Sequence, residues 1–227
     1  MQNLAKTAIK KQLSHTHYLE EFFICASCSY CTDNLAACPV FREVKHEVVT
    51  GRGKMQLARL LSLGRLSKDR ESIEGLRDGL FQCTFCGACE KVCMEQIPLM
   101  KIYRELKGLP IIQELLLEPT QKICQNLDNY HNIYGLSQED RNMWSYYCEE
   151  LYNKSLNSES NVGFFIGCVS SYSGRAAPLV EAVLKITEIA GEEIKVFSPE
   201  EWCCGNPYLL AGQINKARKF AKYNVET

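Results

Sequence analysis

The sequence of 227 residues lacks any long apolar run, since no stretch approaches the roughly eighteen apolar residues that a membrane-spanning helix needs. Residues 1–21 include lysines but no apolar segment followed by small residues, which argues against a secretory signal peptide. An excess of basic charge is also missing, because the formal net charge is −1. Charge therefore gives no reason to expect binding to nucleic acid. We expect a soluble protein, or one that reaches a membrane only through a partner.

Cysteine, by contrast, is abundant. The chain has 13 cysteines, an odd number, and most of them stand in clusters. Both features argue against a disulfide framework and favour metal or redox chemistry. Because thiolates that bind metal must stay reduced, we place the protein in the cytoplasm or at the cytoplasmic face of a membrane. The hydrophobic content of 46% is ordinary for one large or two small globular domains.

The most regular cysteine motif occupies residues 83–93, where gaps of two, two and three residues separate Cys83, Cys86, Cys89 and Cys93. This spacing is typical of a loop that wraps three thiolates around a [4Fe–4S] cluster while the fourth points to a neighbouring cluster. The small residues Gly87 and Ala88 suit such a loop, since glycine accepts unusual backbone angles. A zinc site is the alternative, although zinc prefers two pairs of ligands.

A second group nearly repeats the first and consists of Cys25, Cys28, Cys31 and Cys38. Pro39 directly follows Cys38. The last gap of this group has six residues instead of three, and the other group has Met94 where a proline is expected. Cross-ligation predicts two sets, one of Cys25, Cys28, Cys31 and Cys93, the other of Cys83, Cys86, Cys89 and Cys38. The long gap leaves the role of Cys38 open. Two neighbouring clusters are a conduit for single electrons.

The 44 residues between Cys38 and Cys83 predict helices, because apolar residues recur at helical spacing after Gly53 and again over residues 73–81. Residues 51–54, Gly-Arg-Gly-Lys, lack the spacer and the hydroxyl residue of a phosphate loop. We interpret them as a basic helix start near a cluster or a partner. A further helix is expected over residues 4–13, followed by His15 and His17 on a loop.

Residues 25–107 resemble the α-helical ferredoxin domain of iron–sulfur subunits from heterodisulfide reductase, glycolate oxidase and anaerobic glycerol-3-phosphate dehydrogenase. The resemblance lies in Cys-Pro-Val-Phe-Arg at 38–42, in Arg52-Gly53-Lys54 before a Leu-rich helix, and in Cys86-Gly87-Ala88-Cys89. It implies two [4Fe–4S] clusters that relay electrons between a flavin-bearing partner and a second acceptor, with the flavin on the partner. We expect this mainly α domain to span residues 1–117 and a connector to span 118–160.

The connector contains Cys124 and Cys148 without partners at any ligand spacing, and isolated buried cysteines behave as small hydrophobic residues. After it, residues 162–168 form an apolar run that predicts a buried strand ending at Cys168. A helix from about Pro178 to Gly191 and a second strand over 193–197 follow. The unit is therefore strand–helix–strand with parallel strands.

Cys203-Cys204-Gly205 stands in the loop after the second strand, where open α/β sheets place their ligands. This segment is similar to the cysteine-rich (CCG) domain of the same family, with 34 residues between Cys168 and Cys203. The closing Cys-x-x-Cys pair of that domain is absent. We therefore expect residues 161–227 to be its N-terminal half, from a fragment or a split gene. Cys168, Cys203 and Cys204 are weaker metal-ligand candidates, for a further cluster if another chain completes the domain.

These patterns favour an electron-transfer subunit of an oxidoreductase complex, related to 2-hydroxy acid dehydrogenases or to heterodisulfide reductase. Its expected partner is a flavoprotein dehydrogenase or another redox subunit, and no catalytic residue is assigned on this chain. Two alternatives stay open at this point. One is a zinc-dependent interaction module without a redox role, and the other is a thiol/disulfide reductase that acts at Cys203 and Cys204.

Overall fold

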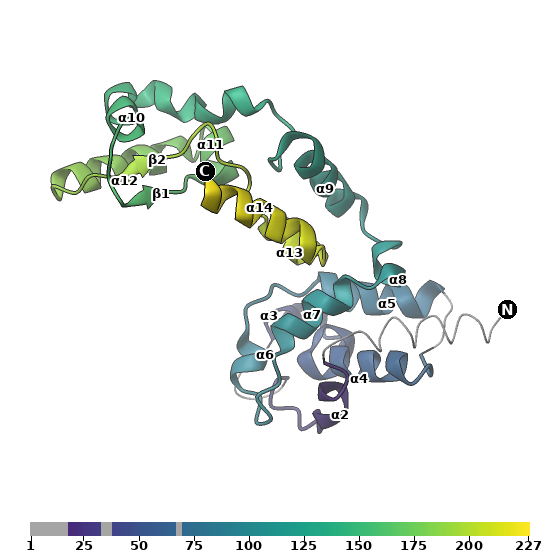
Figure 1. Ribbon diagram of the computed structural model, residues 1–227. Coiled ribbons are helices and arrows are strands. Elements are labelled where there is room, and N and C mark those ends of the chain that lie inside the picture. The colour runs from purple at the N-terminus through teal and green to yellow at the C-terminus, as the bar shows by residue number, and fades with distance from the viewer. Residues whose placement is uncertain (1–17, 33–37, 67–69) are drawn as a thin grey trace. The chain divides into compact units, whose positions relative to one another are not determined.

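The computed structural model describes residues 18–32, 38–66 and 70–227. The chain divides into two compact units (Figure 1). The first comprises Met1–Leu116 with Leu210–Gln213, and the second comprises Leu117–Leu209 with Ile214–Thr227. The helix expected over residues 4–13 and the loop with His15 and His17 lie outside the described residues.

The described part of the first unit is helical. Its elements are α2 (Glu21–Ile24), α3 (Pro39–Val44), the 3₁₀-helix η1 (Glu47–Val49), α4 (Gly51–Ser62), α5 (Arg70–Phe81), α6 (Ala88–Lys91), α7 (Leu99–Lys107) and α8 (Pro110–Gln113). The two helices expected between the cysteine groups are confirmed as α4 and α5. Thr50 caps α4, since its hydroxyl accepts a hydrogen bond from the backbone N–H of Gly53 at 2.9 Å.

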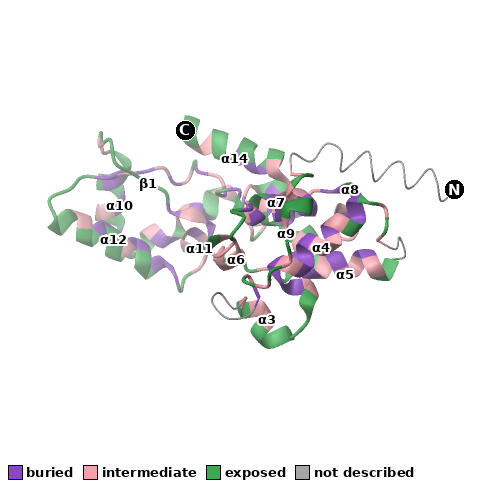
Figure 2. Ribbon diagram, turned by 90° about the horizontal axis from the view of Figure 1, so that it is seen from below, coloured by how far each residue is buried: buried purple, intermediate pink, exposed green. Residues whose placement is uncertain are grey.

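The core of this unit lies between α4, α5 and α7. Purple segments in Figure 2 mark its buried residues along α4 and α5. Met55 and Ala58 of α4, Leu76 and Leu80 of α5, and Tyr103 of α7 are fully buried. Cysteines of both groups pack against this core, namely Cys25, Cys83, Cys89 and Cys93. The helices therefore form a rigid support for the cysteine loops.

The second unit contains a small sheet with helices around it. Its elements are α9 (Glu118–Tyr130), η2 (Gln138–Tyr147), α10 (Glu149–Leu156), β1 (Gly163–Phe164), α11 (Gly167–Tyr172), α12 (Ala177–Ile189), β2 (Lys195–Val196), α13 (Asn206–Ala211) and α14 (Ile214–Glu226). The first three come from the segment expected as a connector. Trp144 of η2 and Tyr152 of α10 pack with Val180 and Val196 in the core of the unit.

The predicted strand–helix–strand unit is confirmed. β1 and β2 pair in parallel, with Gly163 opposite Lys195 and Phe164 opposite Val196, and α12 lies between them in the chain. The prediction that the first strand ends at Cys168 is wrong, because Cys168 lies in α11. β1 ends at Phe164, Ile166 already has right-handed helical backbone angles, and α11 begins at Gly167, whose φ of +76° is left-handed.

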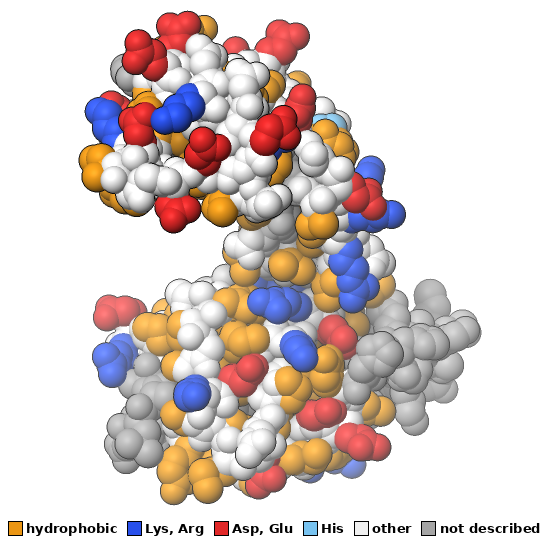
Figure 3. All heavy atoms as spheres, turned by 60° about the vertical axis from the view of Figure 1, so that its left-hand side comes forward, with side chains coloured by type: hydrophobic (Ala, Val, Ile, Leu, Met, Phe, Trp, Pro, Cys, Tyr) orange, Lys and Arg blue, Asp and Glu red, His pale blue; other side chains and the backbone are white. Residues whose placement is uncertain are grey.

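The described part of the chain contains no helix that is both long and apolar enough to cross a membrane. Figure 3 shows acidic side chains predominating on the visible face of the second unit, with apolar side chains between them. No broad basic area is seen on that face. This distribution agrees with the absence of an overall basic charge in the sequence.

Candidate metal centres

One cavity of the first unit is lined by cysteines from both groups. Cys25, Cys28 and Cys31 of the first loop contribute to its wall, and so does Cys93 from the end of the second loop. These are the four residues that cross-ligation assigns to one cluster. Cys89, Met55 and Leu99 complete part of the same wall. The arrangement brings together residues that are more than sixty positions apart in the sequence.

The loop with Cys25, Cys28 and Cys31 is shaped by Ser27 and Ser29, which have φ values of 55° and 70°. Side chains of α4 hold both serines in place. Gln56 Nε2 donates a hydrogen bond to Ser27 Oγ at 2.5 Å, and Arg52 donates one to Ser29 Oγ. These contacts offset the cost of the left-handed conformation and present the three thiols to the cavity.

In the second group, Phe85 and Gly87 have φ values of 54° and 75°, so this loop also turns through left-handed conformations. Cys89 follows in the first turn of α6. Burial raises the pKa of the Cys89 thiol to about 12, although the nearby charge of Lys54 and a hydrogen bond with Tyr103 act in the opposite direction. Cys83 lies close enough to both Cys89 and Tyr103 to raise their pKa values.

Cys38 lies near Lys54, because both side chains contact the carbonyl of Val49. The Cys38 thiol lies 3.8 Å from the Val49 carbonyl oxygen, and the ammonium group of Lys54 donates a hydrogen bond to that carbonyl. Two of the four residues expected for the other cluster, Cys38 and Cys89, therefore lie near Lys54, and Cys83 lies near Lys107. Cys86, the fourth, is exposed on the loop between them.

The donor set suits a cluster better than a single ion. Among the described residues, no three histidine, cysteine, aspartate or glutamate side chains converge closely enough to hold one metal ion. A zinc ion needs four ligands at about 2.0–2.3 Å, whereas a [4Fe–4S] cluster spreads four thiolates over four irons. The buried ammonium of Lys54 also fits an anionic group beside it. The thiols thus suit iron–sulfur clusters better than a zinc ion.

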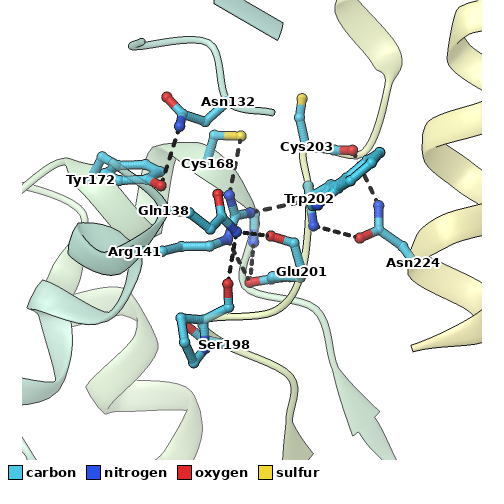
Figure 4. Close-up of polar contacts among 12 residues, drawn as sticks. Asn132, Gln138, Arg141, Cys168, Tyr172, Ser198, Glu201, Trp202, Cys203 and Asn224 are labelled. Carbon is cyan, nitrogen blue, oxygen red and sulfur yellow. Dashed lines mark hydrogen bonds and ion pairs between the residues drawn. The ribbon is translucent and has the colours of Figure 1, made fainter. Parts of the chain in front are cut away.

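A third cysteine site lies in the second unit, where Cys168 of α11 meets the Cys203-Cys204 loop. Figure 4 shows Cys168 next to the Arg141 guanidinium, with Cys203 beside them. A hydrogen bond with Cys203 lowers the pKa of Cys168 to about 7, and the charge of Arg141 acts in the same direction. Arg141 Nη1 lies 4.0 Å from Cys168 Sγ. A hydrogen bond with Cys203 also lowers the pKa of Cys204, to about 6.

Arg141 and Glu201 form a buried ion pair at the base of this site (Figure 4). Arg141 Nε lies 3.7 Å from Glu201 Oε1, and the two side chains are 0% and 1% exposed. The backbone N–H of Gly167 donates to the same carboxylate oxygen at 3.3 Å. Burial nevertheless raises the pKa of Glu201. The pair therefore connects η2, the start of α11 and the segment that leads into Cys203.

Sequence reasoning missed several residues at these sites. Arg141 and Glu201 stand in polar stretches without a motif, so only their burial identifies them. Tyr103 looked like one more apolar position of a helix. Lys54 was expected near a cluster or a partner, and the structure places it beside Cys89. Of the remaining cysteines, Cys124 and Cys148 are buried.

Two known protein families match separate segments of the chain. Residues 21–97 match the family described as 4Fe-4S dicluster domain, and residues 162–227 match the family described as cysteine-rich domain, CCG. The first match contains all eight cysteines of the two groups, and the second contains Cys168, Cys203 and Cys204. The chain is thus an iron–sulfur protein of the 4Fe-4S type.

Curated relatives include a subunit of the dihydromethanophenazine:CoB–CoM heterodisulfide reductase of Methanosarcina acetivorans, which is 28% identical over 69% of this chain and 38% of its own length. A subunit of the CoM/CoB fumarate reductase of Methanothermobacter marburgensis is 25% identical over 87% of this chain and 38% of its own length. A probable glycolate oxidase iron–sulfur subunit of Bacillus subtilis is 22% identical over 90% of this chain and 53% of its own length.

The chain spans about two fifths of the length of the first of these relatives. No solved structure matches it. The two matched families, the printed names of the relatives and the cysteine spacing all point to iron–sulfur binding. The chain therefore combines a 4Fe-4S dicluster domain with a cysteine-rich domain, and it is similar to iron–sulfur subunits of the heterodisulfide reductase and glycolate oxidase type.

Proposed function

We propose that this chain relays single electrons through two [4Fe–4S] clusters within an oxidoreductase complex. One cluster is held by Cys25, Cys28, Cys31 and Cys93, and the other by Cys38, Cys83, Cys86 and Cys89. A partner that carries flavin exchanges electrons with one cluster, and a second acceptor exchanges them with the other. Because the thiolates must stay reduced, the complex works in the cytoplasm or at the cytoplasmic face of a membrane.

The observation that carries this proposal is the cavity whose wall combines Cys25, Cys28 and Cys31 with Cys93. A self-contained loop would close around its own fourth cysteine, which for the first group is Cys38. Here the thiol of Cys38 instead lies by Val49, whose carbonyl also accepts from Lys54. The exchange of fourth ligands is the pattern of two-cluster ferredoxin sequences, in which neighbouring clusters lie close enough for electron transfer.

The clusters supply one-electron carriers, and the chain supplies their surroundings. Cys83, Cys89 and Cys93 pack against the apolar core of the first unit, which limits the access of water. The exposed residues Cys28 and Cys86 mark the points where each site reaches the surface. A redox partner that docks over either residue approaches the corresponding cluster most closely.

Iron and sulfide analysis of anaerobically purified protein tests this function. We expect about eight irons and eight sulfides per chain, with an electron paramagnetic resonance (EPR) spectrum of two interacting clusters after reduction by dithionite. Zinc in place of iron, in a colourless protein, would overturn the proposal and favour the interaction module. Iron for one cluster alone would also refute the two-cluster relay.

A second candidate is thiol–disulfide chemistry at Cys203 and Cys204. The specific observation in its favour is the contact of Cys168, Cys203 and Arg141, which places a buried cation beside adjacent thiols. Replacement of both Cys203 and Cys204 by Ser separates the two candidates. Loss of disulfide reduction with unchanged iron content would support this second function, and unchanged activity would refute it.

A further inference from the structure

Two lysines are buried within the first unit. Lys54 of α4 and Lys107 of α7 are each 2% exposed. The Lys54 ammonium donates a hydrogen bond to the Val49 carbonyl and lies 5.0 Å from the centre of the Tyr103 ring. The Lys107 ammonium donates to the Leu210 carbonyl of the same unit at 2.8 Å and lies 4.4 Å from the centre of the Phe85 ring. Lysine is almost never fully buried without a charged partner.

No carboxylate of the described residues forms an ion pair with either lysine. The anionic groups beside them are instead the expected ligands of one cluster. Lys54 lies near Cys89 and shares the Val49 carbonyl with Cys38, and Lys107 lies near Cys83. Burying an ammonium without a counter-charge is costly, so the fold implies a permanent negative charge at this place.

The cavity with Cys25, Cys28, Cys31 and Cys93 has a different charge environment. Its cation is Arg52, whose guanidinium pairs with Glu47 at 2.6 Å and is 27% exposed. Its wall also includes Glu95, an exposed carboxylate. A paired and partly hydrated cation attracts an added electron weakly, and a nearby carboxylate repels it. The two sites thus differ in the sign and in the burial of the charges beside them.

We propose that Lys54 and Lys107 make the site of Cys38, Cys83, Cys86 and Cys89 the more readily reduced of the two. This inference rests on the proposed two-cluster function. Reduction adds one electron to a site, and the external donor loses that electron. The added charge is stabilised by an ammonium held at short range in an apolar core, where screening by water is weak. Net charge and hydrogen bonding are the means by which proteins set cluster potentials.

The difference in ease of reduction between the two sites gives electron transfer a direction. At equilibrium an electron that enters at either site comes to rest at the site beside Lys54. The first site then serves as the entry or the exit with the lower reduction potential. Both lysines act through the cluster without being its ligands, so they are positioning residues for charge and not catalytic residues.

A redox titration of the full chain followed by EPR tests the inference. Cys28→Ser and Cys86→Ser first assign each signal to its site, because each removes one ligand from one set. In the unchanged chain we expect the signal that Cys86→Ser alters to appear first as dithionite is added. Lys54→Met should lower the equilibrium constant for reduction of that site about tenfold, or about 59 mV for one electron. The other site should shift much less.

Matched variants separate charge from packing. Lys54→Arg keeps the charge and should restore most of the potential, whereas Lys101→Met removes an exposed charge from α7 and should change neither site. If Lys54→Met fails to fold, Lys107→Met tests the same effect on the reduction potential of that site. Reduction of the Cys28 site first, or equal shifts of both sites, would overturn the inference. Iron for fewer than two clusters would instead refute the proposed function.

Discussion

Cys31 and Cys89, one from each cysteine group, both lie against the position that a Cβ would take at Gly51, the first residue of α4. A Cβ at Gly51 would lie 3.2 Å from Cys31 Sγ and 3.1 Å from Cys89 Cβ. A single residue without a side chain therefore contacts ligands assigned to different clusters. This close approach explains why a glycine stands at a helix start where the basic residues Arg52 and Lys54 follow.

Gly51→Ala should lower cluster content. The added methyl group would meet two cysteines at distances shorter than most Cβ contacts, so both loops must move. We expect iron per chain to fall by about half or more, because a displaced thiolate no longer binds its iron. Iron analysis of anaerobically purified protein measures this effect.

Gly75→Ala is the matched control, since it also adds a methyl group within a helix. A Cβ at Gly75 in α5 would have no atom within 4 Å. This variant should keep its iron and gain about 1 kcal/mol of unfolding free energy, because alanine favours helix more than glycine does. Equal iron loss in both variants would show that the effect of Gly51→Ala is not local.

Cys93→Ser and Cys38→Ser should each remove one cluster, and each a different one. Cys93 lines the cavity with Cys25, Cys28 and Cys31, whereas Cys38 lies near Lys54 with Cys89. Each variant should hold about half of the original iron, and their EPR spectra should differ. Cys124→Ser, which changes a buried cysteine of the second unit, should keep all iron. Loss of the same signal in both cysteine variants would contradict cross-ligation.

Arg141→Met should destabilise the protein in a pH-dependent way. Without Arg141 the buried Glu201 keeps an uncompensated charge, which costs about 3–5 kcal/mol. Burial already raises the pKa of Glu201, and loss of Arg141 raises it further. When an acid has a higher pKa in the folded than in the unfolded state, its contribution to stability is largest at low pH and is lost as pH rises. The deficit of Arg141→Met should therefore be smallest at acid pH and grow as pH rises above the ordinary pKa of glutamate, about 4.3.

Chemical denaturation at several pH values measures that deficit. Adding Glu201→Gln to Arg141→Met removes the buried charge and should recover part of the lost stability at the higher pH values. A deficit that stays constant with pH would mean that Arg141 contributes by packing, through contacts such as that with the Tyr172 ring at 5.7 Å.

Cys204 should react faster than Cys203 with iodoacetamide in protein freed of iron. Its pKa is lowered to about 6 by the hydrogen bond with Cys203, and its side chain is exposed, whereas Cys203 is 2% exposed. The thiolate is the reactive form, so the rate should rise through about pH 6 and level off above it. Mass spectrometry of the alkylated peptides measures the extent of labelling at both cysteines. Preferential labelling of Cys203 would contradict this order.

Much of the fold followed from local patterns. Helical spacing of apolar residues predicted α4, α5 and α12, because an amphipathic helix must place one face against a core. The parallel pairing of β1 with β2 followed from the order strand, helix, strand. The end of β1 did not follow, since apolar residues at 165–168 suit a strand and a helix equally well. In the structure β1 ends at Phe164 and Ile166 has helical backbone angles.

The sequence by itself determined the eight cysteines of the dicluster domain and their two groups, because ligand spacing is a property of the chain. Cross-ligation also predicted which thiols share a site, but the sequence could not determine which charges lie beside them. Only the tertiary structure brings Cys93 to the cavity of the first loop and surrounds Cys89 with Lys54 and Tyr103. Those relations depend on how α4 and α7 pack, and electrostatic effects depend on burial and distance, which spacing does not encode.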